Sequence, residues 1–310
     1  LYRQGRAEVR ENHVAVPDHV KQLAMESKKY FKNPLSEFIF YRSYSRWIDD
    51  EGRRETWIET VDRYLNFMRE NVGNKITDHE FKELREGILK QEVMPSMRLM
   101  WSAGTAARKT NVCAYNCSFI APSKIEDFAE IMYLSMCGAG VGYSVESQTV
   151  QQLPIIKRQS GRTLLNHIVA DSKEGWMESL TLGIRTWFNG EDVKFDYSLL
   201  RKAGARLMTM GGRSSGPGPL RALLDFARVK ILANQGKRLR NIDVHDIICK
   251  IGEVVVMGGV RRSALISLSD LDDKEMRDAK TGQFYLNEPQ RSMANNSAVY
   301  LERPSAVHFM

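Results

Sequence analysis

The chain has 310 residues, of which 43% are hydrophobic and 27% are charged. That composition is typical of a soluble globular protein, and because the sequence has neither an apolar run long enough to span a bilayer nor a signal-peptide pattern at Leu1, we expect a cytoplasmic protein with no membrane partner. The net charge of +7 suits polyanionic partners, but 45 basic residues are interspersed with 38 acidic ones, so nucleotide phosphates would satisfy it as well as DNA would.

The length and the two ends of the chain bear on its organisation. A chain of this length has room for about two domains, or for one large α/β domain with an insertion. It begins at Leu1 rather than at a methionine and stops at Met310 just after a strand-like run, which predicts a piece of a longer protein.

Residues 1–90 are predicted to form a mainly helical amino-terminal region. Apolar residues recur at helical spacing between Glu55 and Glu70. Thr77 followed by Glu80 has the pattern of a capping box, which predicts a helix that runs to about Lys90.

Residues 91–148 are predicted to form the first part of an α/β barrel or sheet. Cys117 lies in an alternating, strand-like segment. Ser123 and Glu126 predict a second capping box, and the helix that it starts should end at Gly138. The CGAGVG segment then leads from this helix into another strand.

Residues 149–257 read as an inserted subdomain. Amphipathic helices are expected at about 174–188 and 220–234, with a glycine-rich connection at 211–220. Asp243 can cap a further helix, which is almost continuously apolar and is therefore expected to be buried.

Residues 258–310 begin with GGVRRSA, which joins that buried helix to a predicted strand at 264–268. A second strand is expected at 298–301. Helices that alternate with short buried strands indicate the α/β class, and the sequence has no internal repeat.

The chain contains four unevenly spaced cysteines: Cys113, Cys117, Cys137 and Cys249. This spacing does not make a disulfide framework, and a cysteine on a strand is usually a small buried hydrophobe. A functional role for Cys117 is favoured by its surroundings, namely a Pro-Ser turn at Ser96, the neighbouring amide of Asn116, and the CGAGVG loop, which could meet at strand ends.

Cys113 and Cys117 are four residues apart, which invites a metal site. No second pair of ligands accompanies them and the six histidines are scattered, so no metal is expected. On a single strand the two sulfurs would lie about 13 Å apart, too far for a disulfide. We therefore interpret Cys113 as a bystander.

Three glycine-rich segments are each open to two interpretations. CGAGVG contains half of a dinucleotide fingerprint, but in reversed order, with the helix before the strand. Its glycines are interpreted as positions where the backbone passes close to a ligand or turns with a positive φ. A plain helix cap at Gly138 would leave Gly140 and Gly142 unexplained. The two arginines of GGVRRSA either lie in a solvated turn or grip a phosphorylated ligand. RSSGPGPL could cradle phosphate at a helix N-terminus or serve as a surface connection.

Six segments follow one another in a specific order: VMPSMRLMWSAG, YNCSF, MCGAGVGYSVE, SSGPGPL, GGVRRSALISLSD and QRSMANNSAVY. In this order they resemble the amino-terminal half of an adenosylcobalamin-dependent (class II) ribonucleotide reductase, and most of all its ribonucleoside-triphosphate reductase branch. The resemblance extends from about Asn33 to Met310. It implies part of a ten-stranded α/β barrel with an amino-terminal helical region and a helical insertion.

The resemblance implies a substrate site around one cysteine. Cys117 matches the first redox-active cysteine of the family, which gives up an electron pair as the ribose loses its 2′-hydroxyl, and its disulfide partner would lie beyond the end of this chain. Ser96, Asn116, Gly138 and Gly140 would bind the substrate.

The resemblance also implies an effector site. Residues 145–157, with parts of 166–256, match the region that binds a deoxyribonucleoside triphosphate effector, and GGVRRSA matches the loop that relays effector identity to the substrate base. The residues implied for binding and specificity are Val145, Glu146, Ser147, Gln148, Lys157, Gly259, Arg261, Arg262 and Ser263.

Cofactor and partners follow from the same resemblance. Adenosylcobalamin would generate a thiyl radical on another cysteine, the substrate would be a ribonucleoside triphosphate, and thioredoxin would return the electrons to a monomeric enzyme. The sequence contains no Asn-Pro-Cys-x-Glu segment for that radical and no carboxy-terminal cysteine pair. We therefore expect an incomplete cobalamin site and no turnover by this chain alone.

Two other interpretations stay open. Within the enzymes, the chain could derive from a dimeric ribonucleoside-diphosphate reductase or a class I large chain, although the long insertion favours the monomeric type. From a different class, it could be a basic nucleic-acid-binding module, but scattered basic residues usually form a solvated surface, and no nucleic-acid partner is expected. The basic residues concerned are Arg201, Lys202, Arg206, Arg213, Arg221, Lys237, Arg238 and Arg240.

Overall fold

A computed structural model describes residues 16–205, 207, 213–257 and 264–309. The chain divides into two compact units, Leu1–Arg108 and Lys109–Met310, and each is described by itself. The four-part division at residues 90, 148 and 257 stays a prediction. None of the helices in the described ranges is long and apolar enough to cross a membrane.

The first unit is mostly helical, and its helices begin where the sequence supplies caps. The hydroxyls of Thr56 and Thr77 each accept a hydrogen bond from the backbone N–H of the glutamate three residues later. In return, the carboxylate of that glutamate accepts a hydrogen bond from the backbone N–H of the threonine. Each box satisfies backbone N–H groups that the first helical turn would otherwise leave without partners. The elements are α1 (Asp18–Lys28), α2 (Pro34–Ser43), β1 (Trp47–Ile48), β2 (Arg53–Arg54), α3 (Trp57–Val72), η1 (Gly73–Lys75), α4 (Asp78–Leu89), α5 (Met97–Ser102) and, across the unit boundary, α6 (Thr105–Lys109).

The core of the first unit forms around the apolar face of α3. Trp57, Val61 and Leu65 recur at helical spacing, and they pack with Phe40 of α2 and Leu89 of α4. The helical spacing seen in the sequence between residues 55 and 70 is therefore the face that this unit buries.

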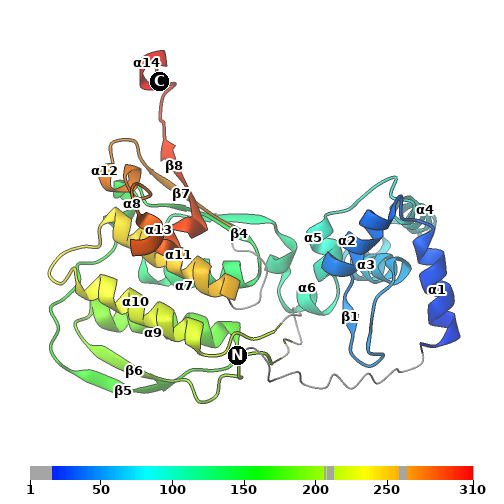
Figure 1. Ribbon diagram of the computed structural model, residues 1–310, viewed down its shortest axis with the longest axis horizontal. Helices are drawn as coiled ribbons and strands as arrows, with labels where there is room; N and C mark the ends of the chain where they lie inside the picture. The colour runs from blue at the N-terminus through cyan, green and yellow to red at the C-terminus, as the bar shows by residue number, and fades with distance from the viewer. Residues whose placement is uncertain (1–15, 206, 208–212, 258–263, 310) are drawn as a thin grey trace, which may run out of the picture. The chain divides into compact units, whose positions relative to one another are not determined.

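The second unit is built on a four-stranded parallel sheet in the order β3-β4-β7-β8. The strands are β3 (Cys117–Ile120), β4 (Gly140–Ser144), β7 (Leu265–Asp270) and β8 (Ala294–Val299). One face of this sheet is covered by α7 (Ile125–Met136) and α11 (Asn241–Met257), which pack on Val141, Tyr143 and Leu265 (Figure 1). The alternate residues of each strand point to the other face.

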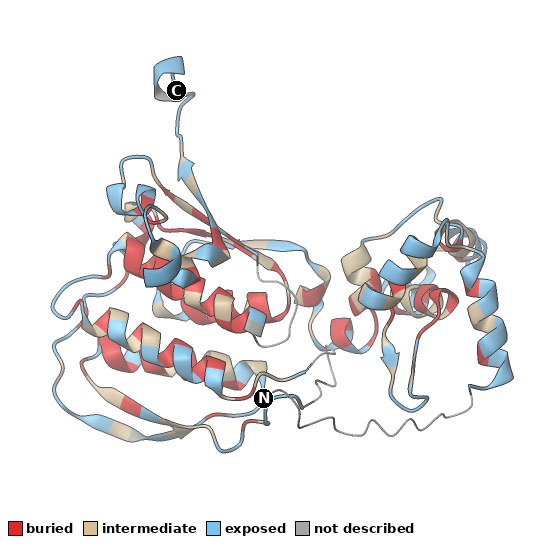
Figure 2. Ribbon diagram, viewed as in Figure 1, coloured by how far each residue is buried: buried red, intermediate tan, exposed pale blue. Residues whose placement is uncertain are grey.

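The insertion folds against this sheet domain as two helices and a second small sheet. The predicted helices are α9 (Lys173–Phe188) and α10 (Gly218–Leu232), which lie side by side. Buried residues run along α9, α10 and α11 where the three helices face one another (Figure 2). Two strands that the sequence interpretation missed, β5 (Thr163–Ile168) and β6 (Asp192–Asp196), pair in parallel next to these helices.

Short elements complete the second unit: η2 (Asn111–Ala114), α8 (Ser147–Val150), α12 (Lys274–Arg277), α13 (Phe284–Asn287), η3 (Pro289–Met293) and α14 (Ala306–Phe309). Three local predictions are wrong. The helix after Pro122 is capped one residue later than predicted, because Asp127 rather than Glu126 accepts the backbone N–H groups of Ser123 and Lys124. The last strand lies at 294–299 rather than at 298–301. Cys113 lies in η2 and not on the strand of Cys117.

Candidate active site on the open face of the sheet

Cys117 is the one exposed cysteine of the four. It is the first residue of β3 and pairs in register with Gly140 of β4. Residues in register point to the same face of a sheet, so the thiol stands over the bare backbone of Gly140, on the face opposite α7 and α11. An exposed thiol next to an uncovered backbone is available to a substrate.

Gly140 brings two chain segments close together. Its N–H donates to the carbonyl of Asn116 over 2.8 Å. A Cβ atom at this position would lie 3.4 Å from the carbonyl oxygen of Ala264 and 3.6 Å from that of Asn116. The strand starts of β3, β4 and β7 therefore meet at Gly140, and the exposed Asn116 lies directly before the thiol.

Gly138 ends α7 with a left-handed turn. Its φ is +85°, its N–H donates to Ser135 over 2.8 Å, and the N–H of Ala139 donates to Leu134 over 3.1 Å. These two bonds make a Schellman motif, which explains a glycine here without a ligand. Its assignment to substrate binding stays a prediction.

Ser96 caps α5 in the first unit, where its hydroxyl accepts from the N–H of Leu99 over 3.4 Å. Cys117 belongs to the second unit. The predicted meeting of Ser96 with the thiol thus stays a prediction, as does its role in substrate binding.

The other cysteines near the sheet are buried. The thiol of Cys113 donates to the carbonyl of Thr110 over 3.0 Å. Burial raises the pKa of Cys137, and the amino group of Lys173 lies 3.7 Å from its sulfur. A buried thiol with a raised pKa is a poor nucleophile, which disfavours Cys137 as a reactive residue.

Comparisons with known proteins agree with the resemblance read from the sequence. Residues 16–105 match the family model described as ribonucleotide reductase alpha domain. The chain is 30% identical over 311 residues to an adenosylcobalamin-dependent ribonucleoside-triphosphate reductase of Euglena gracilis, with 94% of this chain and 42% of that protein aligned. It is 28% identical over 332 residues to the protein of the same name from Lactobacillus leichmannii, with 86% and 45% aligned.

The chain is similar in sequence to adenosylcobalamin-dependent ribonucleoside-triphosphate reductases. It spans less than half the length of the curated relatives that it matches. In three dimensions it is similar to a solved B-12 dependent (class II) ribonucleotide reductase, with a TM-score of 0.72 and 21% identity over 90% of this chain and 48% of that one. The mixed α/β fold with a parallel sheet is therefore that of a class II reductase.

The residues that the sequence predicts for effector binding begin at the carboxyl end of β4. Val145 is buried and its N–H donates to Leu268 of β7 over 2.8 Å. The carboxylate of Glu146 accepts from Ser144 over 2.7 Å. The N–H of Ser147 donates to Asp270 over 2.7 Å. These contacts fix the chain direction as it leaves the sheet.

The remaining effector residues are more scattered. Gln148 follows in α8, where its carbonyl accepts from the side chain of Gln152, and Lys157 is exposed, with its N–H donating to Phe188 over 2.9 Å. Gly259, Arg261, Arg262 and Ser263 lie outside the described residues.

An open pocket of about 520 Å³ lies in the insertion, and the sequence interpretation did not find it. It is lined by Asn166, Lys194, Phe195, Asp196, Tyr197, Ser198, Pro217 and Arg221. The Arg221 guanidinium lies 4.9 Å from the centre of the Tyr197 ring, and burial raises the pKa of Tyr197 to about 12. Two cations and two aromatic rings at one pocket suit a ligand that has both an anionic and a flat part.

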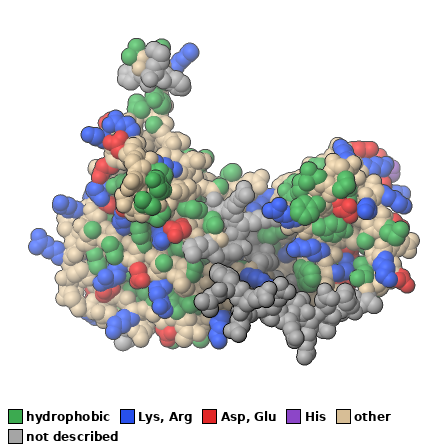
Figure 3. Space-filling view, viewed as in Figure 1, with side chains coloured by type: hydrophobic (Ala, Val, Ile, Leu, Met, Phe, Trp, Pro, Cys, Tyr) green, Lys and Arg blue, Asp and Glu red, His purple; other side chains and the backbone are tan. Residues whose placement is uncertain are grey.

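Four of the eight basic residues considered for nucleic-acid binding have partners within the chain, and Arg206 lies outside the described residues. Arg201 pairs with Asp171 at 2.7 Å, and Arg240 pairs with Asp243 at 2.9 Å and with Glu275 at 2.6 Å. Arg213 and Arg238 donate to backbone carbonyls. On the side shown in Figure 3, Lys and Arg side chains are dispersed among acidic and apolar ones and form no single basic patch.

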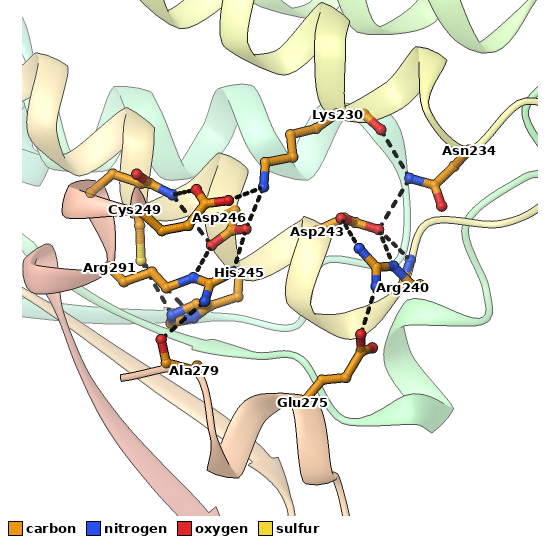
Figure 4. A network of polar contacts seen from close by, with 12 residues as sticks. Lys230, Asn234, Arg240, Asp243, His245, Asp246, Cys249, Glu275, Ala279 and Arg291 are labelled. Atoms are coloured by element: carbon orange, nitrogen blue, oxygen red, sulfur yellow. Dashed lines mark hydrogen bonds and ion pairs between the residues drawn. The ribbon is translucent and has the colours of Figure 1, made fainter. Parts of the chain in front are cut away.

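A buried polar network holds α11 in place (Figure 4). Asp246 is fully buried and accepts two bonds from Arg291 of η3, at 2.6 and 2.9 Å, and one from Lys230 of α10 at 2.7 Å. Lys230 also reaches Glu288 at 2.9 Å. The network therefore joins the insertion helix α10 to α11 and to the segment that leads into β8.

Next to Asp246, three polar side chains fill the core between β4 and α11. The hydroxyl of Tyr143 lies 2.8 Å from Nδ1 of His245 and 3.6 Å from the sulfur of Cys249. Burial lowers the pKa of His245 to about 4 and raises that of Cys249 to about 12. All three are neutral near pH 7, so this cluster serves packing and not acid-base catalysis.

Proposed function

We propose that this chain is the part of an adenosylcobalamin-dependent ribonucleoside-triphosphate reductase that carries its first redox-active thiol and its effector-binding insertion. In the proposed reaction the C2′–OH bond of the ribose is replaced by a C2′–H bond, two thiols become one disulfide, and the hydroxyl leaves as water. Cys117 is one of those thiols. The observation that carries the proposal is its exposure on the open face of the sheet, beside Gly140.

The cofactor enters this proposal through the relatives, whose names make them adenosylcobalamin-dependent. When bound, this group supplies the radical that starts the reaction. Among the described residues there is no group of three or more His, Cys, Asp and Glu side chains that could hold a metal ion. The chain spans less than half the length of these relatives, and we derive no step through the group.

We further propose that the sheet is part of a ten-stranded barrel. Parallel sheets are normally covered on both faces, yet Phe119 and Ile266 are about half exposed on the face that bears Cys117. Further strands, from the part of the reductase that this chain does not span, would turn that face into the inside of a barrel. Asn116 and Gly140 would then bind the substrate near the thiol, and Ser96 of the first unit stays a predicted substrate contact.

The effector is proposed to bind to the insertion. Val145, Glu146, Ser147, Gln148 and Lys157 stay the predicted contacts. The pocket between β6 and α10 supports this assignment, because it offers Lys194 and Arg221 to phosphates and the rings of Phe195 and Tyr197 to a base. The loop with Arg261 and Arg262 would pass effector identity to the substrate.

Thioredoxin as reductant, a cytoplasmic location and a monomeric state belong to the same proposal. The monomer is supported by the packing of α9 and α10 against α7 and α11, since the insertion helices cover surfaces that would otherwise be free to dimerise.

The test is Cys117→Ser in the complete enzyme. We expect nucleotide binding to be unchanged and multiple-turnover reduction to be lost, because a hydroxyl cannot form the disulfide. Cys113→Ser is the matched control, four residues earlier and buried, and should keep multiple turnover. Unimpaired turnover by Cys117→Ser would refute the assignment.

A further inference from the structure

One row of residues crosses the open face of the sheet beside the thiol. Phe119 pairs in register with Gly142, Gly142 with Ile266, and Ile266 with Asn295. Phe119 is two residues after Cys117 on the same strand, so the row and the thiol share a face. None of the four side chains is charged.

The ring of Phe119 lies over the backbone of Gly142 and occupies the space of a side chain there. A Cβ atom there would lie 3.1 Å from Cδ2 of Phe119 and 3.9 Å from Cε2. The glycines with positive φ do not include Gly142, so the backbone conformation alone does not call for glycine. The close ring does favour glycine, since a methyl group at this position would require the ring of Phe119 to shift.

The upper side of that ring is open. Phe119 is 56% exposed and Ile266, two strands away in the same row, is 46% exposed. Together with the bare Gly142 they make a flat apolar strip. An aromatic ring that rests on backbone and presents its free face suits a flat, uncharged partner, which stacks on it.

We propose that Phe119, seated on Gly142, is the floor on which the sugar and base of the nucleotide lie, and that it positions the ribose over the Cys117 thiol. This assignment rests on the proposed function. The row spans three strand spacings, about 14 Å, and its far end is the exposed amide of Asn295, a hydrogen-bonding group for the uncharged part of the ligand. The triphosphate is excluded from the row, which has no cation to pair with it.

The floor can be tested on this chain without turnover. Cys117 is alkylated with N-phenylmaleimide and with N-ethylmaleimide, which share one reactive group but differ in having a flat aromatic or a small aliphatic tail. Stacking worth about 0.5–1.5 kcal/mol makes the phenyl reagent react about 2- to 10-fold faster relative to the ethyl reagent than it does with a free thiol. Cys117→Ser shows that the signal comes from this residue.

Substitutions in the row then identify the source of the preference. Phe119→Leu should abolish it and Phe119→Tyr should keep it. Gly142→Ala should reduce it by displacing the ring. Circular dichroism confirms that each variant is folded. A preference that survives Phe119→Leu in a folded protein would overturn the proposal.

The complete enzyme separates this inference from the proposed function. There Phe119→Leu should raise KM for the ribonucleotide and lower kcat, with effector binding unchanged. If the labelling preference depends on Phe119 but Cys117→Ser leaves turnover intact, the proposed function fails and the aromatic floor stands. If Cys117→Ser abolishes turnover but the preference for the phenyl reagent does not depend on Phe119, only the proposed role of Phe119 is wrong.

Discussion

Replacing Asp246 by Asn should destabilise the second unit strongly. The substitution keeps the shape of the side chain, so it leaves no cavity and removes only the charge. Asp246 is fully buried, and the side chains of its cationic partners Arg291 and Lys230 are only 16% and 18% exposed. Lys230 keeps Glu288 at 2.9 Å, but Arg291 loses both bonds to a carboxylate and keeps only the carbonyl of Ala279 at 3.0 Å.

Breaking a buried pair from one side costs about 3–5 kcal/mol, because the remaining charge stays buried without its partner. We expect a loss of this size for Asp246→Asn in urea unfolding, with the hydrogen exchange of α11 amides as the local readout. Arg291→Gln combined with Asp246→Asn should cost less than the sum of the two single changes, since the double variant has no orphaned guanidinium.

The matched control is Glu275→Gln, which lies in the same network but on the surface. Glu275 and Arg240 are 52% and 54% exposed, and such pairs contribute about 0–1 kcal/mol. Equal losses for Asp246→Asn and Glu275→Gln would refute the reasoning. The pH dependence is a second check. Burial raises the pKa of Asp246, but bonds from Arg291 and Lys230 outweigh it and lower that pKa below the ordinary 3.8, so the stabilisation is present at neutral pH and is lost only as the pH falls below that value.

Three further outcomes are expected. Burial lowers the pKa of His245 from 6.5 to about 4, so between pH 6.5 and pH 4 the unfolded chain binds a proton that the folded chain does not. The free energy of unfolding should therefore fall by up to about 3 kcal/mol as the pH drops across this range. His245→Gln should remove this pH dependence in thermal unfolding. Gly138→Ala should cost about 1–2 kcal/mol because φ is +85°, whereas Gly218→Ala, in open space without a positive φ, should change stability little in the same urea titration. Thr77→Ala removes the cap of α4 and should destabilise the first unit by about 1 kcal/mol, seen as faster hydrogen exchange in α4.

The helices were predictable because their signals are local. The box at Thr77 and Glu80 starts α4 at Asp78, and the apolar spacing after residue 55 marks α3. Where two neighbouring residues could both cap a helix, the predicted start of the helix was wrong by one residue. Asp127 and Glu126 are adjacent acids, and only the folded backbone shows that Asp127 accepts the two N–H groups.

The strands of the insertion were missed because their sequences look like loops. Asn166 and His167 interrupt β5, and Lys194 and Asp196 make β6 polar. Each strand is short and partly exposed, so neither shows the continuous apolar run of a buried parallel strand. The pocket that they form with α10 could not be inferred, since it depends on segments 50 residues apart coming together.

The candidate site was only partly predictable for the same reason. Cys117 and the glycines after α7 could be chosen as candidates from the sequence, and their roles stay predictions. What could not be read is the register that puts Cys117 opposite Gly140 and Phe119 opposite Gly142, because parallel pairing joins residues separated by an entire helix. Gly142 therefore looked like a ligand contact, and the structure gives it the ring of Phe119 instead.

The exposure of Cys117 decides between two meanings of a cysteine on a strand. Most cysteines are small apolar residues of a core, and Cys249 of helix α11 is one of them, with burial raising its pKa to about 12. Cys117 occupies the other face, where its neighbours in the sheet are bare or only half covered. An apolar strip left uncovered costs free energy in water, and in the proposed barrel further strands would enclose this face, so that the thiol and the strip would line its inside.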